Sequence, residues 1–120
     1  MLKHELLRDD GILILRPQGP LQADDFTSLA SVVDPYLQEH STLRGIMIDA
    51  QSFPGWDSFA ALVSHLKFVR DHHRLIGKIA AVSDSPILSA VPQLAKHFVQ
   101  ADIRHFNAND RATALAWLRQ

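Results

Sequence analysis

Short apolar runs alternate with longer amphipathic segments along the whole chain. Continuous apolar runs, typical of strands that are covered on both faces, occur in residues 11–17, 44–50 and 77–84. The run at 11–17 follows the turn signal Asp9-Asp10-Gly11 and a shorter strand-like segment at 3–8. We therefore expect an N-terminal hairpin, and a last short strand at 102–106.

Between these runs, apolar residues recur at helical spacing and predict helices. In segment 23–40 the stripe is formed by Phe26, Leu29, Val32 or Val33, Tyr36 and Leu37. In segment 56–74 it is formed by Phe59, Leu62, Val63, Leu66 and Val69. The C-terminal segment 109–120 is predicted to use Ala112, Leu115, Ala116 and Leu118, with Trp117 beside them.

Two prolines fall inside helical patterns. Pro35 removes a backbone donor, so it is expected to kink or split the helix at 23–40. Ser85 is a suitable N-cap with Pro86 at the first helical position. Pro92 then predicts a break, with a short first piece followed by a second helix through Leu94 and Phe98.

The element order predicts the fold class. Strands that alternate with helices form a mostly parallel sheet with crossover connections. We predict an α/β fold with a small mixed, mostly parallel sheet of about five strands, an N-terminal hairpin and about four helices. The 120 residues are expected to form a single domain, 1–120.

Composition and charge narrow the function. Twelve Lys and Arg against 13 acids, with no long basic run, argue against nucleic acid as a partner. No cysteine is present, which excludes disulfides, thiolate catalysis and Cys-ligated zinc. The N-terminus has no secretory apolar region, and no stretch reaches the ~18 apolar residues of a spanning helix. We expect a cytoplasmic protein, with peripheral association at a membrane left open.

The run IDAQSFPGWDSFAALVSHLKFVRDHH, followed by GKIAAVSD and a terminal ALAWL, resembles the SpoIIAA-like proteins of bacteria. These belong to the STAS group and share their fold with the Sec14/CRAL-TRIO lipid-transfer domains. The resemblance covers nearly the whole chain and implies a small sheet with helices mainly on one side. The group contains phosphorylated anti-sigma-factor antagonists, transporter tails and binders of apolar ligands, so function must be argued at the site.

Ser58 is the candidate phosphorylation site that the resemblance implies, because it lies near the helix start that follows the third strand. The Asp-Ser-Ser-Gly-like motif of the antagonists is absent, and Asp57 would repel a phosphate on Ser58. Helix capping by Ser58 or Asp57 is the favoured interpretation.

A hydrolytic site is a second hypothesis. Asp49 and Asp84 end strands that we expect to be adjacent, and Ser52, Ser83 and Ser85 lie close to them in sequence. No nucleophile elbow or glycine-rich phosphate loop accompanies them, so we predict no enzyme, no catalytic residue and no cofactor.

Metal binding is also disfavoured. His65 and His72 share one side of a helix, but at 1.5 Å per residue they lie ~10.5 Å apart along its axis. We expect no metal site and interpret His72 and His73 as solvated residues near a helix end, where the dipole favours cations.

An apolar binding surface is the favoured hypothesis. Its predicted ligand-contacting residues are Phe53, Trp56, Phe59, Ile87, Leu88 and Val91. Phe53, Pro54 and Trp56 are also the predicted membrane-contacting residues, since Trp is favoured at bilayer interfaces. The competing interpretation, that these residues fill the ordinary core, is preferred for Phe59 and Val91.

We therefore predict a non-enzymatic module that binds a small nonpolar or amphipathic, lipid-like ligand, with transient membrane association. The helix that begins near Trp56 and the one that begins near Ser85 would separate to admit the ligand. The alternative is a regulatory protein-interaction module of the STAS type, with or without phosphorylation of Ser58. A protein partner or a homodimer is compatible with either hypothesis.

Overall fold

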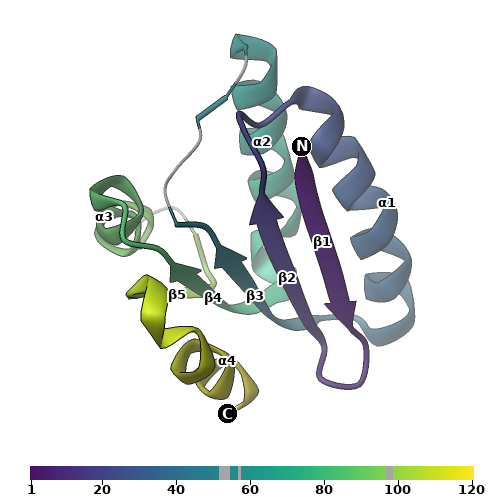
Figure 1. The fold of residues 1–120 in the computed structure, drawn as a ribbon. Helices are drawn as coiled ribbons and strands as arrows, with labels where there is room; N and C mark the ends of the chain where they lie inside the picture. The colour runs from purple at the N-terminus through teal and green to yellow at the C-terminus, as the bar shows by residue number, and fades with distance from the viewer. Residues whose placement is uncertain (52–54, 57, 97–98) are drawn as a thin grey trace.

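The computed structural model describes residues 1–51, 55–56, 58–96 and 99–120, and it does not describe the side chains of Ile87 and Leu94. Five strands form one sheet in the order in which they occur along the chain: β1 Leu2–Leu7, β2 Ile12–Pro17, β3 Leu43–Asp49, β4 Ile76–Val82 and β5 Asp102–Phe106. The strands β1 and β2 pair antiparallel as a hairpin, whereas β2 to β5 run parallel (Figure 1). The predicted α/β class, mixed sheet and hairpin are confirmed.

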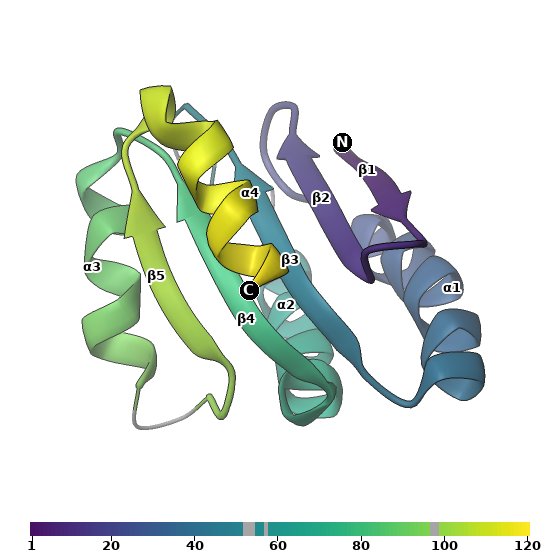
Figure 2. The same cartoon turned by 90° about the horizontal axis from the view of Figure 1, so that it is seen from below.

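The described residues include four α-helices that pack over or beside this sheet: α1 Ala23–His40, α2 Phe59–His72, α3 Pro86–Ala95 and α4 Arg111–Arg119. The helices α1 and α2 lie over one face and α4 over the other, while α3 lies beside the edge strand β5 (Figure 2). Both faces of the central strands are therefore covered, which explains their continuous apolar runs.

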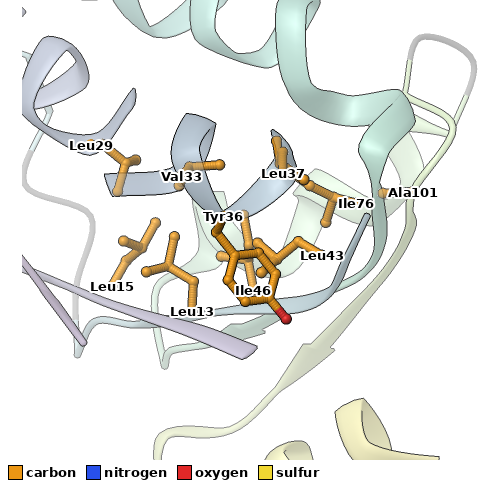
Figure 3. Packing of buried hydrophobic residues seen from close by; sticks show 10 residues of the cluster. All are labelled: Leu13, Leu15, Leu29, Val33, Tyr36, Leu37, Leu43, Ile46, Ile76 and Ala101. Carbon is orange, nitrogen blue, oxygen red and sulfur yellow. The ribbon is translucent and has the colours of Figure 1, made fainter. Parts of the chain in front are cut away.

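The core on the α1 side is formed by the stripe that the sequence predicts for this helix. Phe26, Leu29, Val33, Tyr36 and Leu37 are the buried residues of α1. Four of these, with Phe26 the exception, pack against strand residues such as Leu13, Leu15 and Ile46 (Figure 3).

The opposite core packs α4 onto the sheet. Ala114, Trp117 and Leu118 of α4 are buried against Ile12, Ile14, Met47, Ala80, Val82 and Phe106. The predicted α4 stripe is partly wrong, because Ala112 and Ala116 are exposed and Ala114 faces the sheet instead. Small alanines on all sides of this helix make its periodicity a weak signal.

The predicted stripe of α2 is wrong for three of its five residues, whereas Leu62 and Val69 are partly buried. Phe59 is 78% exposed and Leu66 60%, and Val63 is also exposed, so these three do not fill the core. The helix instead buries Ala61 and His72, with residues between them at helical spacing partly buried. Apolar periodicity located a real face of α2, but this face is the one that points away from the sheet.

Neither proline interrupts its helix. The helix α1 runs unbroken from Ala23 to His40 through Pro35, and α3 runs from Pro86 to Ala95 through Pro92. The predicted split at Pro35 and break at Pro92 are therefore wrong. The predicted start of α3, with Ser85 as N-cap and Pro86 at the first position, is confirmed. Each proline removes one backbone donor, and this loss does not end either helix.

The orientation of α2 predicts how two leucines differ. Leu29→Ala removes a side chain that is 2% exposed and is expected to cost about 2–5 kcal/mol of unfolding free energy. Leu66→Ala makes the same chemical change on the outer face of α2 and should cost about 0.5 kcal/mol or less. Urea denaturation of both variants measures the difference. Equal losses would mean that α2 packs through the stripe that periodicity predicts.

Candidate functional site

An apolar cavity of about 140 Å³ lies between the sheet and the helices α1, α2 and α3. Its lining residues come from β1 to β4, from α1, α2 and α3, and from the segments between them. They are Leu2, Leu15, Pro17, Leu21, Phe26, Leu29, Ile46, Ile48, Ala50, His65, Phe68, Val69, His72, His73, Ile76, Ile79 and Leu88. Nearly all of these side chains are aliphatic or aromatic. An apolar lining of this kind favours apolar guests over water.

Three histidines are the exception to this lining. His65 and His72 belong to α2, and His73 begins the short 3-10 turn that follows it. The Nδ1 of His73 accepts a hydrogen bond of 3.1 Å from the backbone amide of Gln100. Apart from these three imidazoles, the side chains that line the cavity are apolar.

His72 links α2 to α1. Its Nε2 lies 2.7 Å from Asp34 Oδ1, and its Nδ1 lies 2.7 Å from the carbonyl oxygen of Phe68. Both contacts are hydrogen bonds only when both ring nitrogens carry a proton, because both facing atoms are acceptors. The side chain is buried, so the expectation that His72 is solvated is wrong. Its ring also stacks on Phe68, with centroids 4.1 Å apart.

His65 lies between Trp56 and Phe26. The indole Nε1–H of Trp56 donates to His65 Nδ1 at 3.1 Å, and the imidazole stacks on Phe26 with centroids 4.7 Å apart. Burial lowers the pKa of His65 below its usual value, since the apolar surroundings disfavour the charged ring. A neutral His65 is the form that accepts from Trp56.

The predicted ligand-contacting residues are only partly brought together. Leu88 lines the cavity, whereas Trp56, Phe59 and Val91 are not among its lining residues. Trp56 reaches the cavity indirectly, through His65. Phe53 and Pro54 lie outside the described residues, as does the side chain of Ile87.

Sequence reasoning missed most of the cavity wall. The strand residues and the α1 residues that line it carry no signal beyond that of ordinary core positions. The histidines did carry a sequence signal, because His65 and His72 lie seven residues apart on the same side of α2 as Phe68. That spacing identifies the face of α2 that is turned toward the sheet.

Ser58 caps α2. Its hydroxyl accepts a hydrogen bond of 3.2 Å from the amide of Ala61, and the residue is exposed. The predicted cap is confirmed for Ser58, and Asp57 lies outside the described residues.

Polar groups at the carboxyl edge of the sheet hold loops together. Asp49 accepts from Arg111 Nε at 2.9 Å, and Asp84 accepts from the amide of Ala108 at 3.0 Å. The buried Ser83 hydroxyl donates to the carbonyl of Gln51. Both aspartates therefore have structural partners: Asp49 pairs with the first residue of α4, and Asp84 with the backbone that follows β5.

Within the described part of the chain, no group of three or more His, Cys, Asp or Glu side chains is arranged to hold a metal ion. The described helices also include none that is long and apolar enough to cross a membrane.

The family of this chain follows from a comparison of its sequence with family models. The model of the SpoIIAA-like family matches residues 12–119, which include β2 to β5 and all four helices. The chain therefore belongs to the SpoIIAA-like family, and it has the fold of a STAS-type module. A search of curated proteins gives no match.

A solved structure supports the same fold. It is the crystal structure of an uncharacterised protein from the DUF3478 family, with a SpoIIAA-like fold, from Shewanella loihica PV-4. The two chains are 21% identical and superpose with a TM-score of 0.73 over 98% of this chain and 92% of the other. At this identity the likeness concerns the fold.

The His72–Asp34 contact predicts a stability effect. Asp34→Ala removes the acceptor from a buried ring nitrogen and is expected to cost about 1–3 kcal/mol of unfolding free energy. The matched control is Asp71→Ala on α2, whose carboxylate pairs with Arg70 at the surface. This control should leave the urea midpoint unchanged. Identical midpoints for the two variants would contradict a structural role for the His72–Asp34 contact.

Proposed function

We propose that this protein is a non-enzymatic binding module for a small nonpolar or amphipathic ligand, and that the cavity beneath α2 is its site. The observation that carries the proposal is the apolar lining of this 140 Å³ space. A chain that only needed stability would fill such a void, because each buried cavity costs free energy in proportion to its volume.

The volume limits the ligand. Apolar protein cavities of about 150 Å³ accept molecules of the size of benzene. The cavity as it stands therefore has room for a single ring or a short aliphatic chain. A longer lipid-like chain requires α2 and α3 to separate, and Leu88 of α3 is a lining residue that such a movement would displace. Each ~100 Å² of apolar ligand surface that is buried would contribute about 2.5 kcal/mol before the costs of binding.

Filling the cavity tests this site. Ala50 lines it at the end of β3, and Ala50→Leu adds a branched side chain that occupies the space. We expect the variant to fold and to lose any apolar molecule that co-purifies with the wild-type protein. Native mass spectrometry followed by organic extraction measures this loss.

The matched control is Ala116→Leu, which adds the same group at an exposed position on α4. This variant should retain the bound molecule at the wild-type level. A ligand-free wild-type mass, or a ligand retained by Ala50→Leu, would contradict the proposed site.

The proposed membrane association gains support from the outer face of α2. Phe59, Val63 and Leu66 recur at i, i+4 and i+7 and are exposed, with the basic residues Lys67 and Arg70 beside them. An exposed apolar stripe beside cationic side chains fits the surface of an anionic bilayer.

Vesicle binding tests this stripe. Leu66→Ser removes an apolar side chain whose insertion would contribute about 1.5–3 kcal/mol, so partitioning should weaken about tenfold or more. Sedimentation with phosphatidylglycerol–phosphatidylcholine vesicles measures it. Leu75→Ser is the control, because Leu75 is exposed but lies in the 3-10 turn rather than on the stripe. Equal binding of wild type and both variants would exclude the stripe as a membrane contact.

The alternative function is a STAS-type regulatory module that acts through a protein partner. The exposed hydroxyl of Ser58 at the N-terminus of α2 supports it, since a phosphate is electrostatically favoured there. Intact mass of protein from its native host discriminates between the two functions. A stoichiometric phosphate on Ser58, with no apolar ligand, would favour the regulatory module.

A further inference from the structure

Trp56, His65 and Phe26 form a continuous series of ring contacts, and two of them, His65 and Phe26, line the cavity. Trp56 lies 5.9 Å from His65 between ring centroids, and His65 lies 4.7 Å from Phe26. Trp56 precedes α2, and Phe26 belongs to α1, so His65 joins the two segments. A backbone hydrogen bond also joins the segments that precede these two helices, because the amide of Leu21 donates to the carbonyl of Gly55 at 2.8 Å.

The Trp56–His65 hydrogen bond requires a neutral imidazole. The indole nitrogen only donates, so Nδ1 of His65 must supply a lone pair and the ring proton must be on Nε2. Protonation of His65 places a second N–H at Nδ1, directly opposite the indole N–H. Two donors then face each other, and the hydrogen bond is lost.

Among the described residues, the surroundings of His65 offer little to stabilise a charged ring. The cavity-lining residues that the sheet, α1 and α3 contribute are all apolar. The titratable lining groups are His72, which is paired with Asp34, and His73, which accepts from Gln100. The other charged groups of α2 are Lys67, Arg70 and Asp71, all exposed, and Asp71 is paired with Arg70.

We propose that the Trp56–His65 hydrogen bond is an acid-sensitive latch on the apolar cavity, so that the site holds a small uncharged ligand near neutral pH and releases it when His65 is protonated. This inference rests on the proposed function. Two effects of protonation act together: the hydrogen bond that ties Trp56, which precedes α2, to His65 within α2 is broken, and a charge that recruits water appears in the cavity wall.

The direction of the pH effect follows from the buried position of His65. Because its pKa is lowered in the folded protein, the neutral form and the latch are fully present above the ordinary value of about 6.5. As the pH falls below 6.5, the unfolded chain takes up the proton first, and the stability contributed by neutral His65 decreases. The latch itself opens at lower pH, as the folded protein passes through the lowered pKa.

An NMR titration of the full chain tests the latch, with toluene as the probe ligand. The indole N–H signal of Trp56 should shift in one step, at the same pH at which the ring nitrogens of His65 take up a proton. The affinity for toluene should weaken about tenfold per pH unit below that step, because binding then requires release of one proton.

Two variants separate the latch from the cavity. His65→Phe retains a ring against Phe26 but cannot be protonated, so its toluene affinity should not change at the pH of the wild-type step. Trp56→Phe removes the indole donor, so the change of toluene affinity with pH should become smaller while His65 still titrates. His4→Gln is the control, because this exposed histidine of β1 is not among the residues that line the cavity, and its step should match that of the wild type.

The outcomes distinguish the latch from the function on which it rests. Toluene binding that does not change with pH in the wild type, while His65 titrates, overturns the latch and leaves the binding site intact. A change of toluene affinity at the wild-type pH that persists in His65→Phe also overturns the latch and leaves the binding site intact. Absence of toluene binding at every pH overturns both the latch and the proposed site.

Discussion

His72 has a polar contact at each ring nitrogen, and the contact that reaches α1 holds this side of α2 toward that helix. One contact is to Asp34 of α1 and the other to the carbonyl of Phe68, one turn back in α2. With His72 held toward α1, the residues one, two and three turns before it, Phe68, His65 and Ala61, share its side of the helix. Three large apolar residues of α2, Phe59, Val63 and Leu66, are left on the outside.

The cavity and the exposed stripe both follow from this orientation. The inward positions of α2 hold Ala61, His65, Phe68 and His72, and the last three line the cavity. The outward positions hold Phe59, Val63 and Leu66, which the described part of the structure leaves exposed. Neither feature improves the stability of the isolated fold, and this is the physical reason to look for function here rather than at the carboxyl edge of the sheet. There, Asp49 and Asp84 are engaged with the loops that they hold.

The sequence predicted the sheet well, because strands covered on both faces leave continuous apolar runs. The stripe of α1 was also predictable, since this helix has one apolar side and packs through it. The helix α2 has apolar residues on two sides, and periodicity detects the side with the larger ones. The local rule that proline interrupts a helix fails at Pro35 and Pro92, since both helices continue through these residues.

Of the candidate site, Leu88 was predicted and lines the cavity, and Trp56 was predicted but contacts it only through His65. The remaining wall consists of residues such as Leu15, Leu29 and Ile46, which the sequence identifies as core. A sequence pattern shows that a position is buried, but not whether its neighbours fill the space around it. Voids depend on the distance at which two layers are held apart, and this distance is a property of the assembled fold.

A cavity of this size also makes the folded state large for its mass. A volume of 140 Å³ per molecule corresponds to about 80 mL per mole, which is comparable to the whole volume change of unfolding in many small proteins. Unfolding would eliminate this void, so compression opposes the folded state. An occupant of the cavity removes most of the void and with it that sensitivity. If a ligand fills the cavity, the resistance of the folded protein to hydrostatic pressure therefore depends on that ligand.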